Sequence, residues 1–85
     1  MEKLIMNHYN NVVDNIVKKG VFNYEENLRV LKAAKFSITG RIWKAKKSGY
    51  FTKEEIKSLI KARNEGFDKA LVRLEKKVKE AIFTL

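Results

Sequence analysis

Proline is absent from this chain of 85 residues, and that absence constrains its fold more than any other feature. Proline is the residue that most reliably interrupts a helix, and the good helix formers Lys, Glu, Leu and Ala are common here. No segment alternates apolar and polar residues in the way that a half-buried strand does. The sequence therefore predicts an all-α protein, with the glycines at positions 20, 40, 49 and 66 as its main interruptions.

Helix-capping residues divide the chain into three predicted helices. Asn23 and Thr52 are good N-caps, and each is followed three residues later by a glutamate, as in a capping box. Gly20 and Gly49 stand where a residue in the left-handed conformation typically ends a helix. We expect one domain over residues 1–85, a small bundle with helices at about 2–19, 24–48 and 53–83.

Each predicted helix carries apolar residues at helical spacing, which indicates that all three helices pack around one core. In the first helix these residues are Ile5, Tyr9, Val12, Val13, Ile16 and Val17. In the second helix they are Tyr24, Leu28, Leu31, Ala34, Ile38, Ile42 and Ala45. In the third helix they occupy positions 56, 59, 60, 67, 70, 71, 74, 78, 81 and 82.

Two places in this pattern leave the helix geometry open. Four poorer helix formers at 37–40 are a place where the second helix could kink or break, and 64–66 is a candidate bend in the third. An unbroken third helix would be roughly 45 Å long at 1.5 Å per residue, and longer than the first helix. Because its overhanging apolar stripe needs cover, we expect a homodimer.

The positive charge of the chain is concentrated in one segment. There are 19 Lys and Arg against 10 Asp and Glu, a net charge of +9, yet no acidic residue lies between Asn27 and Lys53. The rest of the chain has 11 basic and 10 acidic residues. A local positive field attracts phosphates, anionic lipid headgroups or acidic proteins. The basic residues of the segment are Arg29, Lys32, Lys35, Arg41, Lys44, Lys46, Lys47 and Lys53.

A second stripe runs along the predicted second helix, more than about 90° from its apolar stripe. It consists of Arg29, Lys32, Phe36, Gly40, Trp43 and Lys47, at i+3 and i+4 spacing. Cations neutralise phosphates, aromatic rings stack on unpaired bases, and a glycine permits close approach. Because duplex bases are already paired and stacked, this mixture favours single-stranded or structured RNA over duplex DNA. The predicted binding residues are Arg29, Lys32, Lys35, Phe36, Arg41, Trp43, Lys44, Lys46 and Lys47.

Two other interpretations of Phe36 and Trp43 stay open in the sequence. A helix that contacts two neighbours needs a wide apolar arc, so both rings could belong to the core. Alternatively, both rings could anchor a protein partner, because Trp and basic groups are typical of binding hot spots. The alternative function is then that of an inhibitor that binds an acidic or RNA-bound enzyme.

No pattern in the sequence indicates catalysis, a cofactor or a metal site. There is no Cys, and His8, the only His, falls on the polar side of the first helix. No phosphate loop or nucleophile–base pair is recognisable. The N-terminal apolar run is too short for a signal peptide, and no window is apolar enough for a membrane span. We expect a non-catalytic protein of the cytoplasm.

The small size, the Lys-, Asn- and Ile-rich composition and the segment KAAKFSITGRIWKAKK resemble small phage-encoded proteins that disable a host system. Among these, the chain is similar to the TifA-type antitoxins, which inhibit a ToxN-type endoribonuclease and involve RNA in doing so. That resemblance implies a toxin or defence enzyme and an RNA that share the basic surface, in the host cytoplasm. The chain also resembles bacteriocin immunity proteins, another small, basic, helical class, which implies a target at the membrane instead.

Overall fold

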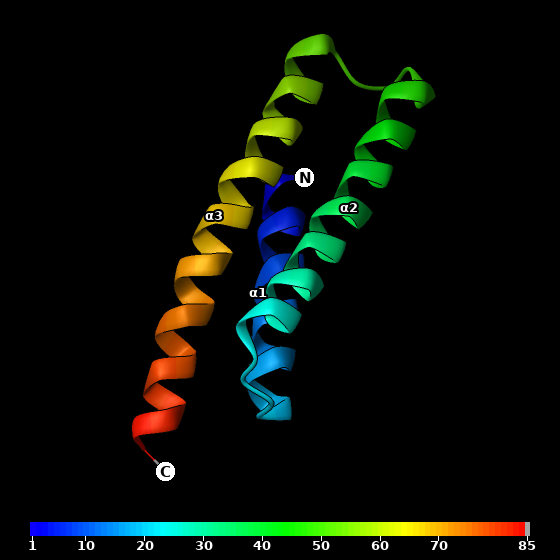
Figure 1. Ribbon diagram of the computed structural model, residues 1–85. Helices are drawn as coiled ribbons and strands as arrows, with labels where there is room; N and C mark the ends of the chain where they lie inside the picture. Colours follow the sequence, from blue (N-terminus) through cyan, green and yellow to red (C-terminus); the bar gives the residue numbers. More distant parts are fainter. Residues whose placement is uncertain (85) are drawn as a thin grey trace.

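The computed structural model describes residues 1–84 and folds as a rod of three helices, 50 × 16 × 16 Å (Figure 1). The helices are α1 (Glu2–Lys19), α2 (Tyr24–Ser48) and α3 (Lys53–Phe83), and each packs against the other two. α1 and α3 run in the same direction, and α2 runs against both (Figure 1). The predicted all-α class and the three predicted ranges are confirmed. Within residues 1–84, none of the helices combines the length and the apolar character needed to span a lipid bilayer.

The helix ends form where the capping residues predict them. The Asn23 side chain accepts a hydrogen bond of 3.0 Å from the backbone N–H three residues further along. Thr52 and Glu55 complete a reciprocal capping box, with bonds of 3.1 Å and 3.0 Å between each backbone N–H and the other side chain. Gly20 and Gly49 adopt the left-handed conformation, with φ of 70° and 77°, that only glycine takes without strain. These local signals therefore set the end of α1, both ends of α2 and the start of α3.

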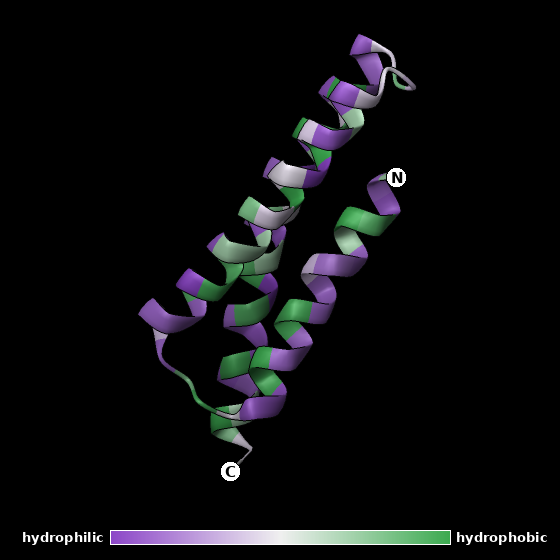
Figure 2. Cartoon of the chain, turned by 90° about the vertical axis from the view of Figure 1, so that its right-hand side faces the viewer, coloured by the Kyte–Doolittle hydropathy of each residue, from purple (hydrophilic) through white to green (hydrophobic). Residues whose placement is uncertain are grey.

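The core is formed by the predicted apolar faces of all three helices. Along each helix, green and purple residues interleave in Figure 2, as helices with one buried face require. Tyr24 was predicted in this core, and that prediction is wrong. It is exposed because it begins α2, where it borders an open groove against α3. Ile60 and Ile82 of the predicted α3 stripe are exposed too. The buried apolar residues are Ile5, Tyr9, Val13, Ile16, Leu31, Ala34, Ile38, Ile42, Leu59, Phe67, Ala70 and Leu74.

Gly66 admits the ring of Tyr9 into the core. Neither candidate interruption is present: α2 continues through 37–40, and α3 continues through 64–66. A Cβ atom on Gly66 would lie 2.9 Å from two carbons of the Tyr9 ring, so only glycine leaves room there. The Tyr9 hydroxyl donates a hydrogen bond of 2.9 Å to the Arg63 carbonyl, and its ring meets the Phe67 ring edge-on at 6.5 Å. Burial raises the pKa of Tyr9 to about 12.

The two helical glycines are expected to respond in opposite ways to alanine. Gly40 is exposed with no atom within 4 Å of a Cβ, so Gly40→Ala should raise the free energy of unfolding by about 1 kcal/mol through helix propensity alone. Gly66→Ala gains the same propensity but forces the Tyr9 ring to move, and overpacking costs roughly 1–3 kcal/mol. We expect a net loss of about 1 kcal/mol for Gly66→Ala in urea titrations followed by circular dichroism. Equal stabilisation by both variants would contradict the tight fit at Gly66.

Candidate nucleic-acid interface

The second stripe of α2 faces away from the bundle. All six of its members, from Arg29 to Lys47, are exposed. Phe36 is 79% exposed and Trp43 is 56% exposed, so neither ring belongs to the core. The reason is that α1 and α3 both pack on one side of α2, through Leu31, Ile38 and Ile42, and leave the opposite side to solvent. The stripe is about 27 Å long at 1.5 Å per residue.

Two ammonium groups lie close to the Trp43 ring. The Lys46 Nζ atom is 5.6 Å from the centre of the Trp43 ring, and the Lys47 Nζ atom is 5.7 Å from it. Both distances are in the range of a cation–π contact, which the ring's negative faces favour. Even with both lysines in place, Trp43 is more than half exposed. The arrangement therefore offers a partly exposed aromatic ring with two positive charges close to it.

The cations of this region are not neutralised by acids elsewhere in the part of the chain that the structure describes. Lys61 pairs with Glu65, and Lys79 with Glu75, both within α3. On α1, the Asp14 carboxylate lies 2.6 Å from the Lys77 ammonium group and 3.6 Å from the Arg73 guanidinium group, both on α3. The hydrogen bond from Lys77 and the two positive charges hold the pKa of Asp14 below its usual value. None of these pairs, the full set over residues 1–84, includes a residue between Asn27 and Lys53. The acid-free segment therefore presents its positive charge to solvent.

Lys35 differs from the other predicted binding residues. Its Nζ atom lies 4.8 Å from the centre of the Phe67 ring on α3, where it covers that core residue. Its carbonyl accepts a hydrogen bond of 2.9 Å from the Thr39 hydroxyl, whose oxygen in turn accepts one of 3.0 Å from Arg63. These contacts join α2 to α3. Lys35 is therefore half-buried at a helix interface, apart from the exposed stripe.

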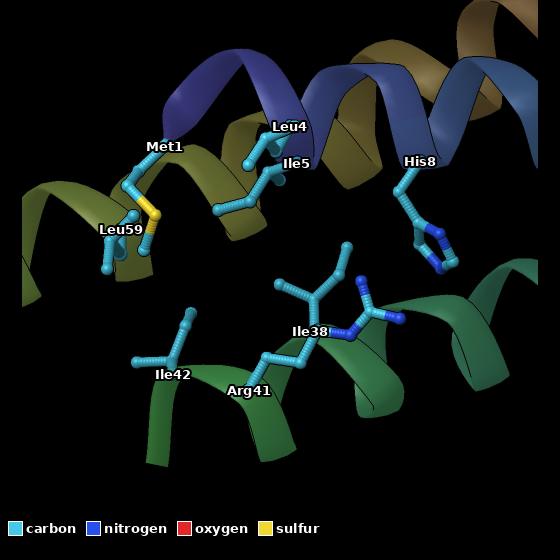
Figure 3. A pocket seen from close by; sticks show the side chains of 8 residues that line it. All are labelled: Met1, Leu4, Ile5, His8, Ile38, Arg41, Ile42 and Leu59. Carbon is cyan, nitrogen blue, oxygen red and sulfur yellow. The ribbon is translucent and has the colours of Figure 1, made fainter. Parts of the chain in front are cut away.

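Arg41 lies on the flank of α2 that faces α1. It borders a cavity of about 140 Å³ whose other lining residues are largely apolar. His8 reaches the same cavity from α1, opposite Arg41 (Figure 3). His8 was expected on the polar surface, and the structure places it half-buried there. Lys44 is exposed and lies between the Arg41 flank and the stripe.

Tyr50 is an aromatic residue at this end of the molecule that the helix-based prediction missed. It is 88% exposed, just after the glycine that ends α2, and its backbone N–H donates to the Ser48 hydroxyl oxygen at 3.3 Å. Tyr50 lies inside the acid-free segment, and that position was the available signal for a binding role. It was missed because it follows the helix, so the comparison of helix faces did not include it. We call the exposed stripe of α2, together with Lys44, Lys46 and Tyr50, the basic–aromatic surface. It comprises Arg29, Lys32, Phe36, Gly40, Trp43, Lys44, Lys46, Lys47 and Tyr50.

Comparison of the chain with protein-family models, with curated proteins and with solved structures gave no match. The chemistry of the basic–aromatic surface therefore has to be inferred from its geometry. Exposed ammonium and guanidinium groups bind phosphate oxygens, and exposed rings bind flat apolar groups such as nucleobases. Among residues 1–84 there is no group of three or more His, Cys, Asp or Glu side chains that could hold a metal ion.

Proposed function

We propose that the protein binds RNA, single-stranded or structured, through the basic–aromatic surface of α2, without catalysing a reaction. The observation that carries this proposal is the exposure of Phe36 and Trp43 on a helix face that has many cations and no acid. Single exposed apolar residues are ordinary on a protein surface, but two large rings on one helix face, here lying among cations, are typical of a contact site. Nucleic acid is the common ligand that satisfies both groups at once.

Unpaired bases suit this surface better than a duplex. The cations along about 27 Å of helix can contact successive phosphates, and the released counterions supply affinity. Phe36 and Trp43 are seven residues apart, about 10 Å along the helix, so each ring can hold a separate base. In a duplex the bases are paired and stacked on each other, and the rings would have no partner. Gly40 lies between the rings, where the missing side chain lets the strand approach the helix closely.

A second function is favoured by the same aromatic residues. Trp and basic groups at the centre of a surface are typical hot spots of protein interfaces, so an acidic or RNA-bound enzyme is an alternative partner. The resemblance to TifA-type antitoxins agrees with such an inhibitor. The two functions are compatible, because an RNA held on α2 can also be held by the inhibited enzyme. Capture of a protein partner that survives nuclease treatment would favour the second function over the first.

Trp43 provides a direct test, because it is the only Trp in the chain. We expect its fluorescence to be quenched when a single-stranded oligouridine of about 15 nucleotides binds, since a base then stacks on the indole. Trp43→Ala should weaken binding by about 5- to 150-fold, which corresponds to the usual 1–3 kcal/mol of one stacked base. The affinity would be measured by fluorescence anisotropy of labelled RNA at physiological salt.

Trp43→Phe is the matched control for this experiment. It keeps a flat ring at the same exposed position and should retain most of the affinity. Binding to duplex DNA of the same length should change little in either variant, because its bases cannot reach the ring. Unchanged Trp43 emission at saturating RNA, together with wild-type affinity of Trp43→Ala, would refute base stacking at this residue.

A further inference from the structure

An apolar groove lies at the end of the molecule opposite the α2–α3 loop. It has a volume of about 460 Å³ and lies between the start of α2 and the C-terminal half of α3. Val72 and Ile82 on its α3 side are 70% and 48% exposed. Val72 and Ile82 belong neither to the core nor to the basic–aromatic surface, and contiguous apolar patches on soluble proteins usually mark a contact. Apart from Val72 and the buried Leu74, the apolar lining residues are Phe22, Tyr24, Leu28, Leu71, Val78 and Ile82.

The residues at the outer edge of this groove are spaced symmetrically along α3. Along α3 it runs Val72, Glu75, Lys79 and Ile82, with spacings of three, four and three residues about position 77. This spacing places all four side chains on one face of the helix. The Glu75 carboxylate and the Lys79 ammonium are already 3.1 Å apart. Glu75 and Lys79 therefore lie at equal distances from position 77, and the apolar residues Val72 and Ile82 lie further out, also at equal distances from it.

We propose that a second copy of this chain covers the groove, with its α3 antiparallel to the first about a twofold axis near residue 77. This arrangement brings Glu75 of each copy opposite Lys79 of the other, so that four charges alternate in sign. It also brings Val72 of each copy opposite Ile82 of the other. A parallel arrangement would instead place Glu75 opposite Glu75, and like charges at an interface are costly. The same patch serves both copies, as in most homodimers.

The symmetric edge favours a second copy over an unrelated partner helix. An unrelated helix would need only an apolar stripe, and nothing would require the acid and the base at equal distances from one point. With the axis near residue 77, the two α2–α3 loops point in opposite directions and lie about 75 Å apart at 1.5 Å per residue. Both basic–aromatic surfaces stay free, and the dimer can hold two segments of one long RNA. The dimer itself does not depend on RNA binding.

Sedimentation equilibrium of nucleic-acid-free protein tests this interface. We expect the wild-type protein to reach twice the 9.9 kDa mass of one chain as its concentration rises through the micromolar range. Glu75→Lys gives four positive charges at the interface and Lys79→Glu gives four negative ones, so each variant alone should self-associate at least about 10-fold more weakly. In an equimolar mixture of the two variants, each lysine of one chain faces a glutamate of the other, and the two variants should form a heterodimer.

Circular dichroism of each variant checks that the helices persist, which we expect because both side chains are exposed. A wild-type protein that stays monomeric at all concentrations would overturn the proposal, and the groove would then serve a different partner. Self-association of both single variants at wild-type strength would overturn it as well. So would weakened variants whose mixture fails to associate, because that result excludes the pairing of Glu75 with Lys79 across the interface.

Discussion

Replacing Lys44, Lys46 and Lys47 together by Glu is expected to abolish RNA binding at physiological salt. The three lysines are exposed near the end of α2, and two of them flank Trp43. If about six phosphates are neutralised in the wild-type complex, the log–log slope of affinity against salt is near −4 for a single strand. Removal of three contacts should make that slope shallower, at about −2, and the three new acids repel the strand. We expect the affinity to fall more than about 100-fold.

A control variant with the same change in net charge distinguishes the effect of where the lysines lie from the effect of the total charge. Lys3, Lys69 and Lys76 are exposed on α1 and α3, and their replacement by Glu should leave most of the affinity intact. Lys46 and Lys47 also stabilise the C-terminal end of α2 through its dipole, so a Lys→Gln version of the triple variant avoids placing acids there. Equal losses in the two triple-Glu variants would mean that binding depends on net charge alone. Full affinity in the Lys44, Lys46 and Lys47 variant would exclude the basic–aromatic surface from RNA binding.

Tyr9→Ala is expected to cause the largest loss of stability of any single substitution in this chain. Tyr9 is fully buried, contacts the ring of Phe67 and fills the space that Gly66 leaves. Truncation of a large buried aromatic residue costs about 3–5 kcal/mol. A domain of this size has a total stability of only roughly 4–13 kcal/mol. We therefore expect partial or complete unfolding at room temperature, measured by circular dichroism because Trp43 is exposed and reports poorly on the core.

Tyr9→Phe and Gly66→Ala together identify the source of this loss. Tyr9→Phe keeps the ring and removes only the hydrogen bond to the Arg63 carbonyl, so it should cost about 1 kcal/mol. In the Tyr9→Ala background the ring is gone, and Gly66→Ala should then be stabilising through helix propensity. Such a change of sign is a coupling between two residues in contact. The contact between Tyr9 and Gly66 is contradicted if Gly66→Ala has the same effect in both backgrounds.

The helices could be predicted from sequence because their signals are local. Asn23, Thr52 and the two left-handed glycines each act on the backbone within a few residues, so no knowledge of the packing was needed. The roles of Tyr24 and Gly66 could not be predicted in the same way. Gly66 has a poor helix propensity that suggests a bend, yet its role is set by a ring 57 positions away in sequence.

Helical periodicity separated Phe36 and Trp43 from the apolar stripe correctly, but it left their surroundings undecided. Whether the α2 face with Phe36 and Trp43 is buried depends on how many helices pack around α2. The sequence of a three-helix protein does not by itself give that arrangement. The same reasoning grouped Lys35 with the exposed lysines, although Lys35 covers Phe67. Its role depends on a residue of α3, and periodicity within α2 carries no information about it. Tyr50 was missed because it follows the helix.

The end of the rod at the α2–α3 loop, where five lysines lie between Trp43 and Ser58, has the thinnest packing. From Trp43 to Ser58 no residue is fully buried, and α2 and α3 extend here beyond the start of α1 (Figure 1). Lysines concentrated on this end also repel one another. Amide protons in this region should exchange with solvent faster than those beside Tyr9, because local opening begins where few apolar contacts resist it. A ligand that neutralises these lysines adds to the stability of the folded end, so that local order and RNA affinity are thermodynamically linked.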